Sequence, residues 1–199
     1  MKHPVSLSFL IFNFSFLISL SSCSDDNDEA PYPSIVTELV DCPTDAEGRM
    51  TEIVLDDDTH LTLTNPQSGL KGSVVYRCLA GYTLSGTQAT LYQLKAATLL
   101  HDSTALAQTD PTGVVSLWRT KHYLNLHLLP KTQGGKQYWG FATDSIVGRH
   151  AYLRLHHRQG DDPTAYSTDV YASLYLTDVL ADTLTLRVQT FSGWSEWTL

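Results

Sequence analysis

The chain has 199 residues, and its 13 Lys and Arg against 21 Asp and Glu give a net charge of −8 at pH 7. Proteins bind phosphate backbones through Lys and Arg that displace counterions, so an acidic chain without a basic stripe excludes nucleic acid as a partner. The length allows one large domain or two small ones.

The first 22 residues form an apolar leader. Lys2 and His3 precede an uncharged run from Val5 to Leu20, which ends in small residues before Cys23. A bilayer-spanning helix needs about 20 apolar residues, and this run is shorter, so residues 1–22 are predicted to be a signal peptide. The junction resembles the lipobox of bacterial lipoproteins. That resemblance implies that Cys23 is lipidated with several acyl chains and anchors the protein to a membrane.

An acidic tether is predicted over residues 23–31, because the segment 24–29 (SDDNDE) is too charged to be buried. This segment also resembles the export signal that directs lipoproteins of the Bacteroidetes group to the cell surface. We therefore expect the protein at the outer face of the outer membrane. The alternative is the periplasmic face.

The first domain, predicted over residues 32–96, is a small barrel. Its five predicted strands are short, rich in β-branched and aromatic residues and bounded by turn residues: 34–41, 50–56, 59–64, 73–82 and 88–95. Turns are expected at Asp56–Asp58 and at Ser85–Gly86, and a loop at 65–69. Five strands without a helical period favour an all-β, OB-like barrel.

Residues 97–110 are predicted to be a linker that holds one irregular strand. Residues 111–199 are predicted to form an antiparallel β-sandwich, because apolar and polar residues alternate, as in Leu124, Leu126 and Leu128. The six predicted strands of this second domain are 114–119, 123–129, 136–143, 150–158, 170–177 and 183–190.

Several runs in both halves resemble the NigD-like lipoproteins of Bacteroidetes. In the first half these are 32–38 (YPSIVTE), 61–66 (LTLTNP), 68–70 (SGL), 76–77 (YR) and 79–82 (LAGY). In the second half they are 115–119 (VSLWR), 123–127 (YLNLH), 133–136 (QGGK) and 138–141 (YWGF). The resemblance implies an OB-like domain followed by a β-sandwich in a lipoprotein family named for a bacteriocin gene cluster. It supplies no catalytic residue.

Two cysteines remain after the leader, Cys42 and Cys78. Outside the cytoplasm they are able to form a disulfide, and the alternative is a pair of buried free thiols. Their spacing matches no zinc site.

No catalytic residue, metal site or cofactor is predicted. The chain contains no Gly-x-Ser-x-Gly, no His-Glu-x-x-His and no phosphate-binding glycine loop. His156 and His157 fall on opposite strand faces, as do His122 and His127, so no local set of ligands faces one way.

Aromatic residues are the better lead to a binding site. Tyr171 and Tyr175 share one face of a predicted strand and are expected to be exposed, where they could stack on a sugar or a partner.

Three functions are therefore considered. The first is a non-enzymatic, membrane-anchored binding module with an unknown protein partner, linked to bacteriocins. The second is a glycan-binding accessory lipoprotein, and the third, ranked last, is an enzyme with a site assembled from distant residues.

Overall fold

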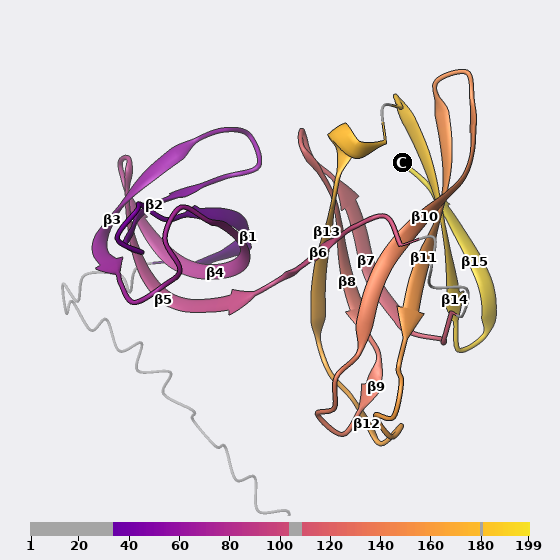
Figure 1. The fold of residues 1–199 in the computed structure, drawn as a ribbon. Coiled ribbons are helices and arrows are strands. Elements are labelled where there is room, and N and C mark those ends of the chain that lie inside the picture. Colours follow the sequence, from indigo (N-terminus) through magenta and orange to yellow (C-terminus); the bar gives the residue numbers. More distant parts are fainter. Residues whose placement is uncertain (1–33, 104–108, 180) are drawn as a thin grey trace, which may run out of the picture. The chain divides into compact units, whose positions relative to one another are not determined.

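The fold is described by a computed structural model covering residues 34–103, 109–179 and 181–199 (Figure 1). The leader, Cys23 and the tether lie outside the described residues. The described residues form strands, with a single 3-10 turn, η1 (Leu176–Asp178). None of their helical segments is long and apolar enough to cross a membrane.

The first half of the chain forms a closed barrel of five strands. They are β1 (Val36–Pro43), β2 (Met50–Val54), β3 (His60–Gln67), β4 (Val75–Ser85) and β5 (Gln88–Ala96). The strand order is β1-β2-β3-β5-β4, and β4 closes the barrel by pairing along the whole of β1. Strands β3 and β5 are parallel, and the other neighbours are antiparallel. The predicted five-stranded OB-like barrel is confirmed.

The expected turns follow from local chemistry. Asp58 adopts a φ of 71°, and the Asp57 carboxylate accepts a hydrogen bond from the backbone of Thr59. The predicted loop at 65–69 begins later than expected, because β3 continues to Gln67. The Asn65 side chain bonds both the N–H and the C=O of Leu91, at 2.9 and 2.8 Å, and so extends the pairing of β3 with β5.

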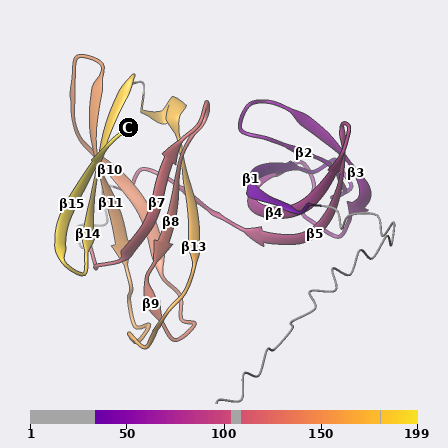
Figure 2. The same cartoon turned by 180° about the vertical axis from the view of Figure 1, so that it is seen from behind.

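The second half forms a sandwich of two four-stranded sheets (Figures 1 and 2). One sheet has the order β6-β13-β8-β7, and the other has the order β10-β11-β14-β15. Their bounds are β6 (Thr98–Leu100), β7 (Gly113–Arg119), β8 (Tyr123–Leu129), β10 (Tyr138–Val147), β11 (His150–Arg158), β13 (Val170–Tyr175), β14 (Thr183–Thr190) and β15 (Gly193–Thr198). A two-stranded sheet pairs β9 (Lys131–Thr132) with β12 (Tyr166–Ser167).

The sandwich differs from the expectation in two details. Two of its strand pairs are parallel, β13 with β6 and β11 with β14. Strand β6 lies inside the segment 97–110 that the sequence predicts to be a linker with one irregular strand, and it pairs with the sandwich.

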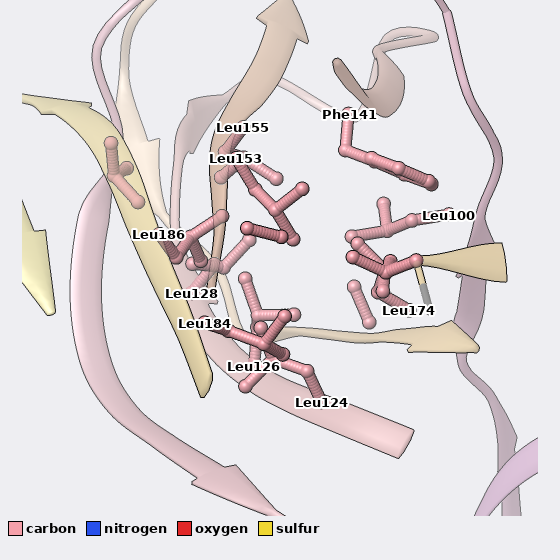
Figure 3. Close-up of a cluster of buried hydrophobic side chains, with 14 residues drawn as sticks. Leu100, Leu124, Leu126, Leu128, Phe141, Leu153, Leu155, Leu174, Leu184 and Leu186 are labelled. Carbon is pink, nitrogen blue, oxygen red and sulfur yellow. The ribbon is translucent and has the colours of Figure 1, made fainter. Parts of the chain in front are cut away.

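The sandwich core is built by the predicted alternation. Leu124, Leu126 and Leu128 of β8 are fully buried and face Leu184 and Leu186 of the opposite sheet (Figure 3). The barrel has a separate core with no residue in common, which includes two cysteines. Each half of the chain therefore buries its own apolar residues.

A buried arginine of the barrel contacts the outward face of β8 and β13. Barrel and sandwich belong to one compact unit, 33–199. The Arg77 side chain is 2% exposed, and its Nη1 lies 3.1 Å from an Asp41 oxygen. Its Nε donates to Ser173 Oγ at 3.0 Å, and its Nη2 donates to Asn125 Oδ1 at 3.1 Å and to Asp56 Oδ2 at 2.9 Å. Tyr123 and Asn125 on the outward face of β8 are buried, although alternation alone predicts this face to be wet.

Candidate functional site

A large pocket lies at the end of the sandwich where β9 and β12 pair (Figure 1). It has a volume of about 700 Å³ and is lined by 133–136, Tyr138, Arg158 and 160–163. A second pocket of about 510 Å³ shares Arg158 and 160–162 and adds Phe191. We call the larger one the loop-end pocket. Loops held at the end of a rigid sandwich are a common place for binding residues.

One buried carboxylate, that of Asp162, holds the loop of this pocket in place. We call Asp162 and the residues bonded to it (Thr132, Gln133, Gly135 and Gln137) the frame of the pocket. Asp162 Oδ2 accepts hydrogen bonds from Thr132 Oγ1 at 2.5 Å and Gln137 Nε2 at 2.7 Å. Its Oδ1 accepts the backbone N–H groups of Gln133 at 2.9 Å and Gly135 at 3.0 Å. These bonds, that of Thr132 first, lower the pKa of Asp162 to about 2. Asp162 therefore acts as a fixed anion that shapes the loop and is poorly suited to exchange protons near neutral pH.

Glycine is required at two positions of the frame. A Cβ added to Gly135 would meet the Asp162 side chain at 2.8 Å. Gly134 has a φ of +92°, which side chains rarely adopt. The close approach of the loop to Asp162 thus depends on the absence of side chains here.

An aromatic ring with two cations forms one wall. The Lys136 Nζ lies 4.8 Å from the centroid of the Tyr138 ring, and the Arg158 guanidinium lies 4.4 Å from it. Tyr138 and Arg158 are register partners in β10 and β11, so the sheet fixes their distance. The ring attracts both cations through its quadrupole without neutralising them.

Phe191 lines the second pocket, and the centroid of its ring lies 5.4 Å from the Lys131 Nζ. Within the described part of the chain, Lys131, Lys136 and Arg158 make no ion pair. In the loop-end pocket, Lys136 and Arg158 stand beside the carboxylates of Asp161 and Asp162.

A buried histidine, His157, contacts Gln137, which in turn bonds Asp162. The ring of His157 stacks on Trp139 with centroids 3.9 Å apart. Its Nε2 lies 2.9 Å from Gln137 Oε1 and its Nδ1 lies 3.2 Å from the Asp110 carbonyl. Because the Gln137 amide nitrogen donates elsewhere, its oxygen faces His157, so both ring nitrogens face oxygen acceptors. Burial lowers the pKa of His157 and keeps the ring neutral.

The two tyrosines predicted as an exposed pair lie on one face of β13, and both are half-buried. The Tyr171 ring stacks on His127 with centroids 4.4 Å apart, and the Tyr175 ring lies 5.2 Å from the Tyr123 ring. Both rings therefore already have aromatic partners. Their role in binding stays a prediction, and the structure does not bring them into the loop-end pocket.

The two cysteines lie together inside the barrel, 1% and 4% exposed. The register of β1 with β4 pairs Cys42 with Tyr76 and Cys78 with Val40, which makes the cysteines diagonal neighbours. A hydrogen bond to Cys78, together with burial, raises the pKa of the Cys42 thiol. Both are free thiols in this structure, and the disulfide stays a prediction.

No group of three metal-ligating side chains gathers among residues 34–103, 109–179 and 181–199. The predicted lipidation site, Cys23, precedes the first described residue. It stays a prediction from the sequence.

The residues of the loop-end pocket were not predicted as a site. The run 133–136 appears in the sequence only as part of the family resemblance. A signal was present in two polar, glycine-containing segments, 133–136 and 159–163, because such segments mark loops. Nothing in the sequence shows that these loops meet, since the pairing of β10 with β11 brings them together.

Comparisons with solved structures show the same fold in Bacteroidetes proteins. A NigD-like immunity protein from Bacteroides caccae is 22% identical, with a TM-score of 0.64 over 84% of this chain and 93% of that chain. A candidate toxin-related protein from Parabacteroides distasonis is 16% identical, with a TM-score of 0.67 over 83% and 92% of the two chains. A candidate lipoprotein from Bacteroides fragilis is 11% identical, with a TM-score of 0.60 over 84% and 97%.

No protein-family model and no curated protein matches the chain. The structural matches cover both the barrel and the sandwich, because they extend over more than four fifths of the chain. The resemblance to NigD-like lipoproteins drawn from the sequence is therefore confirmed at the level of the fold.

Proposed function

We propose that the protein is a non-enzymatic lipoprotein, anchored through Cys23 to the outer face of the outer membrane, that captures an extracellular ligand in the loop-end pocket. The anchor is supported by the leader and its lipobox-like end. It also agrees with the fold shared with a candidate lipoprotein from Bacteroides fragilis.

The observation that carries the binding role is the construction of the pocket. Asp162 fixes the loop through four hydrogen bonds, while Tyr138, Lys136 and Arg158 project from that frame. A preorganised frame lowers the cost of ordering side chains when a ligand binds. Because the pKa of Asp162 is held low, its carboxylate supports a framework role more than proton transfer.

The test is binding to an array of bacterial, plant and host glycans by the full chain in detergent. Wild-type protein is expected to bind at least one glycan, and Tyr138→Ala is expected to weaken that binding at least tenfold, because it removes the ring that positions two cations. Tyr92→Ala is the matched control, since Tyr92 is a 60% exposed tyrosine of the barrel. Equal binding by wild type and Tyr138→Ala would place the site elsewhere.

A protein partner is the second candidate. Strand β10 ends in Ile146 and Val147, which are 53% and 66% exposed just before the turn into β11. This turn lies at the end of the sandwich opposite β9 and β12 (Figure 1). Exposed apolar residues on a hairpin are a common element of protein interfaces. The resemblance to NigD-like lipoproteins favours a bacteriocin as the partner class, because that family is named for a bacteriocin gene cluster, and the fold is shared with a NigD-like immunity protein. Protection against a bacteriocin that is lost with Val147→Asp and retained with Tyr138→Ala would favour this candidate.

A further inference from the structure

A second concave site is formed by side chains of both the barrel and the sandwich, which belong to one compact unit. One pocket has a volume of about 340 Å³, and a neighbouring pocket of about 370 Å³ shares Glu38, Asp56 and Thr120 with it. We call these two pockets together the junction groove. Its lining has no residue in common with that of the loop-end pocket, so the junction groove is a separate site.

The first pocket of the junction groove has an aromatic wall and an aliphatic wall. Trp118 of β7 and Tyr171 of β13 line it from the sandwich, and Leu39 and Leu79 line it from the barrel. His127 already stacks on the Tyr171 ring, whereas the half-buried Trp118 has no ring or cation partner in the described part of the chain. An indole face attracts cations, and the aliphatic stems of Lys and Arg pack against apolar residues.

The junction groove carries an excess of negative charge. Its lining contains the carboxylates of Glu38, Asp56 and Asp57 against one cation, Lys121. The excess remains when the cations beside the lining and their own partners are included, because six carboxylates then stand against three cations, with the histidines neutral. The carboxylates are Glu38, Asp41, Asp56, Asp57, Asp58 and Asp169, and the cations are Arg77, Lys95 and Lys121.

Two carboxylates of the lining have no cationic partner. Asp56 is paired with a buried arginine. Glu38 and Asp57, in contrast, form no ion pair within residues 34–103, 109–179 and 181–199. Their hydrogen-bond donors, the Tyr82 hydroxyl and the Thr59 backbone, are neutral and leave both charges in place. Glu38 lines both pockets and Asp57 lines the second one.

We infer that the junction groove binds a basic peptide. One Lys or Arg side chain lies against Trp118 with its charge at Glu38, and a second places its charge at Asp57. A carboxylate accepts short, strong hydrogen bonds from an ammonium or guanidinium group. The net charge of −8 also attracts such a peptide from solution. The inference goes beyond the proposed function, because it concerns a different site and a different ligand.

The test is isothermal titration of the full chain in a non-ionic detergent with blocked tetrapeptides. The basic probes are tetra-arginine and tetralysine, the neutral probe is tetraglutamine, and spermine is a free polyamine. At least one basic peptide is expected to bind about tenfold more tightly than tetraglutamine, and more tightly than spermine. Its affinity should fall about fivefold between 50 and 300 mM NaCl, because salt screens exposed charges.

Variants of the junction groove locate the binding. Glu38→Gln and Asp57→Asn should each weaken the basic peptide about tenfold, because each replaces a charge-assisted hydrogen bond by a neutral one. Both variants keep an oxygen for the existing donor, so the melting temperature should stay close to that of wild type. Trp118→Leu should weaken the peptide about threefold. The matched control is Glu47→Gln, which removes an exposed carboxylate of the barrel outside the groove and should leave the affinity unchanged.

Each of three results would overturn the inference. If no basic peptide binds, or tetraglutamine binds as tightly, the ligand chemistry is wrong. If spermine binds as tightly as the peptides, the ligand is a free amine. If Glu38→Gln and Asp57→Asn bind no more weakly than Glu47→Gln, the junction groove is not the site. Glycan binding in the loop-end pocket is measured separately, so none of these results decides the proposed function.

Discussion

Two buried side chains at and beside the loop-end pocket, Asp162 and His157, differ in their response to burial. Asp162 is buried and charged, because four donors replace its lost water. His157 is buried, and its burial lowers the pKa of the ring, although the backbone and the charge of Asp110 act in the opposite direction. The two groups stand at opposite sides of Gln137, which donates to one and accepts from the other.

The lowered pKa of His157 predicts a loss of stability in mild acid. The unfolded chain takes up a proton on this ring near pH 6.5, whereas the folded chain binds it only at lower pH. The free energy of unfolding should therefore fall as the pH drops below 6.5, until the folded pKa is reached. Urea denaturation at pH 7.5, 6.5 and 5.5 measures this decrease.

The control separates this ring from the other histidines of the chain. His157→Gln should show a smaller decrease between pH 7.5 and 5.5 than wild type, although it is less stable at every pH because the stack on Trp139 is lost. His101→Gln, at an exposed position, should keep the full decrease. An identical pH dependence in wild type and His157→Gln would show that folding does not lower the pKa of this ring.

Strands could be predicted from the sequence where apolar and polar residues alternate over several positions. Strand β8 was predicted over its full length, 123–129, because three leucines alternate with polar residues. Strands β9 and β12 were missed, because two residues are too few to show alternation. The outward face of β8 was expected to be wet, and it is covered by Arg77, which is 48 residues away from Asn125 in the sequence.

The conformation of the loop between β9 and β10 depends on Gly135, which lies against the Asp162 side chain. Gly135→Ala should destabilise the protein by about 1–3 kcal/mol, because the new Cβ would press on an Asp162 side chain that four hydrogen bonds hold in place. Thermal denaturation measures the loss, and binding of the ligand should weaken with it.

Gly86→Ala is the matched control for this element. At the turn between β4 and β5 the added Cβ meets nothing within 4 Å, so only its left-handed φ of +61° contributes to the cost. Ligand binding by Gly86→Ala should stay at the wild-type value. Unchanged stability of Gly135→Ala would mean that the loop can move away from Asp162.

At the scale of the whole molecule, polar contacts join two separate apolar cores. The Arg77 guanidinium lies 3.9 Å from the centroid of the Tyr123 ring, whose hydroxyl donates to Asp41 at 2.9 Å. Burial, followed by the charge of Asp41, raises the pKa of Tyr123, so its hydroxyl remains a donor. Such a network requires specific partners on both sides, which an apolar contact would not.

Both cores lie after the predicted anchor, and this separates anchoring from folding. Among the described residues the barrel core begins at Val40 and the sandwich core at Leu100, and both follow the predicted leader and tether in the sequence. Cys23→Ser should therefore move the protein from the membrane fraction to the soluble fraction and leave its melting temperature within about 1 °C of wild type. The physical reason is the loss of acyl chains, each CH₂ of which contributes about 0.8 kcal/mol to membrane binding.

Fractionation of cells followed by a carbonate wash, with thermal denaturation of the purified proteins, measures both effects. Ser24→Ala changes the neighbouring residue without removing the thiol, and this variant should stay in the membrane fraction. If Cys23→Ser also resists the wash, another part of the protein holds it at the membrane. A lowered melting temperature would instead show that the anchored end contributes to folding.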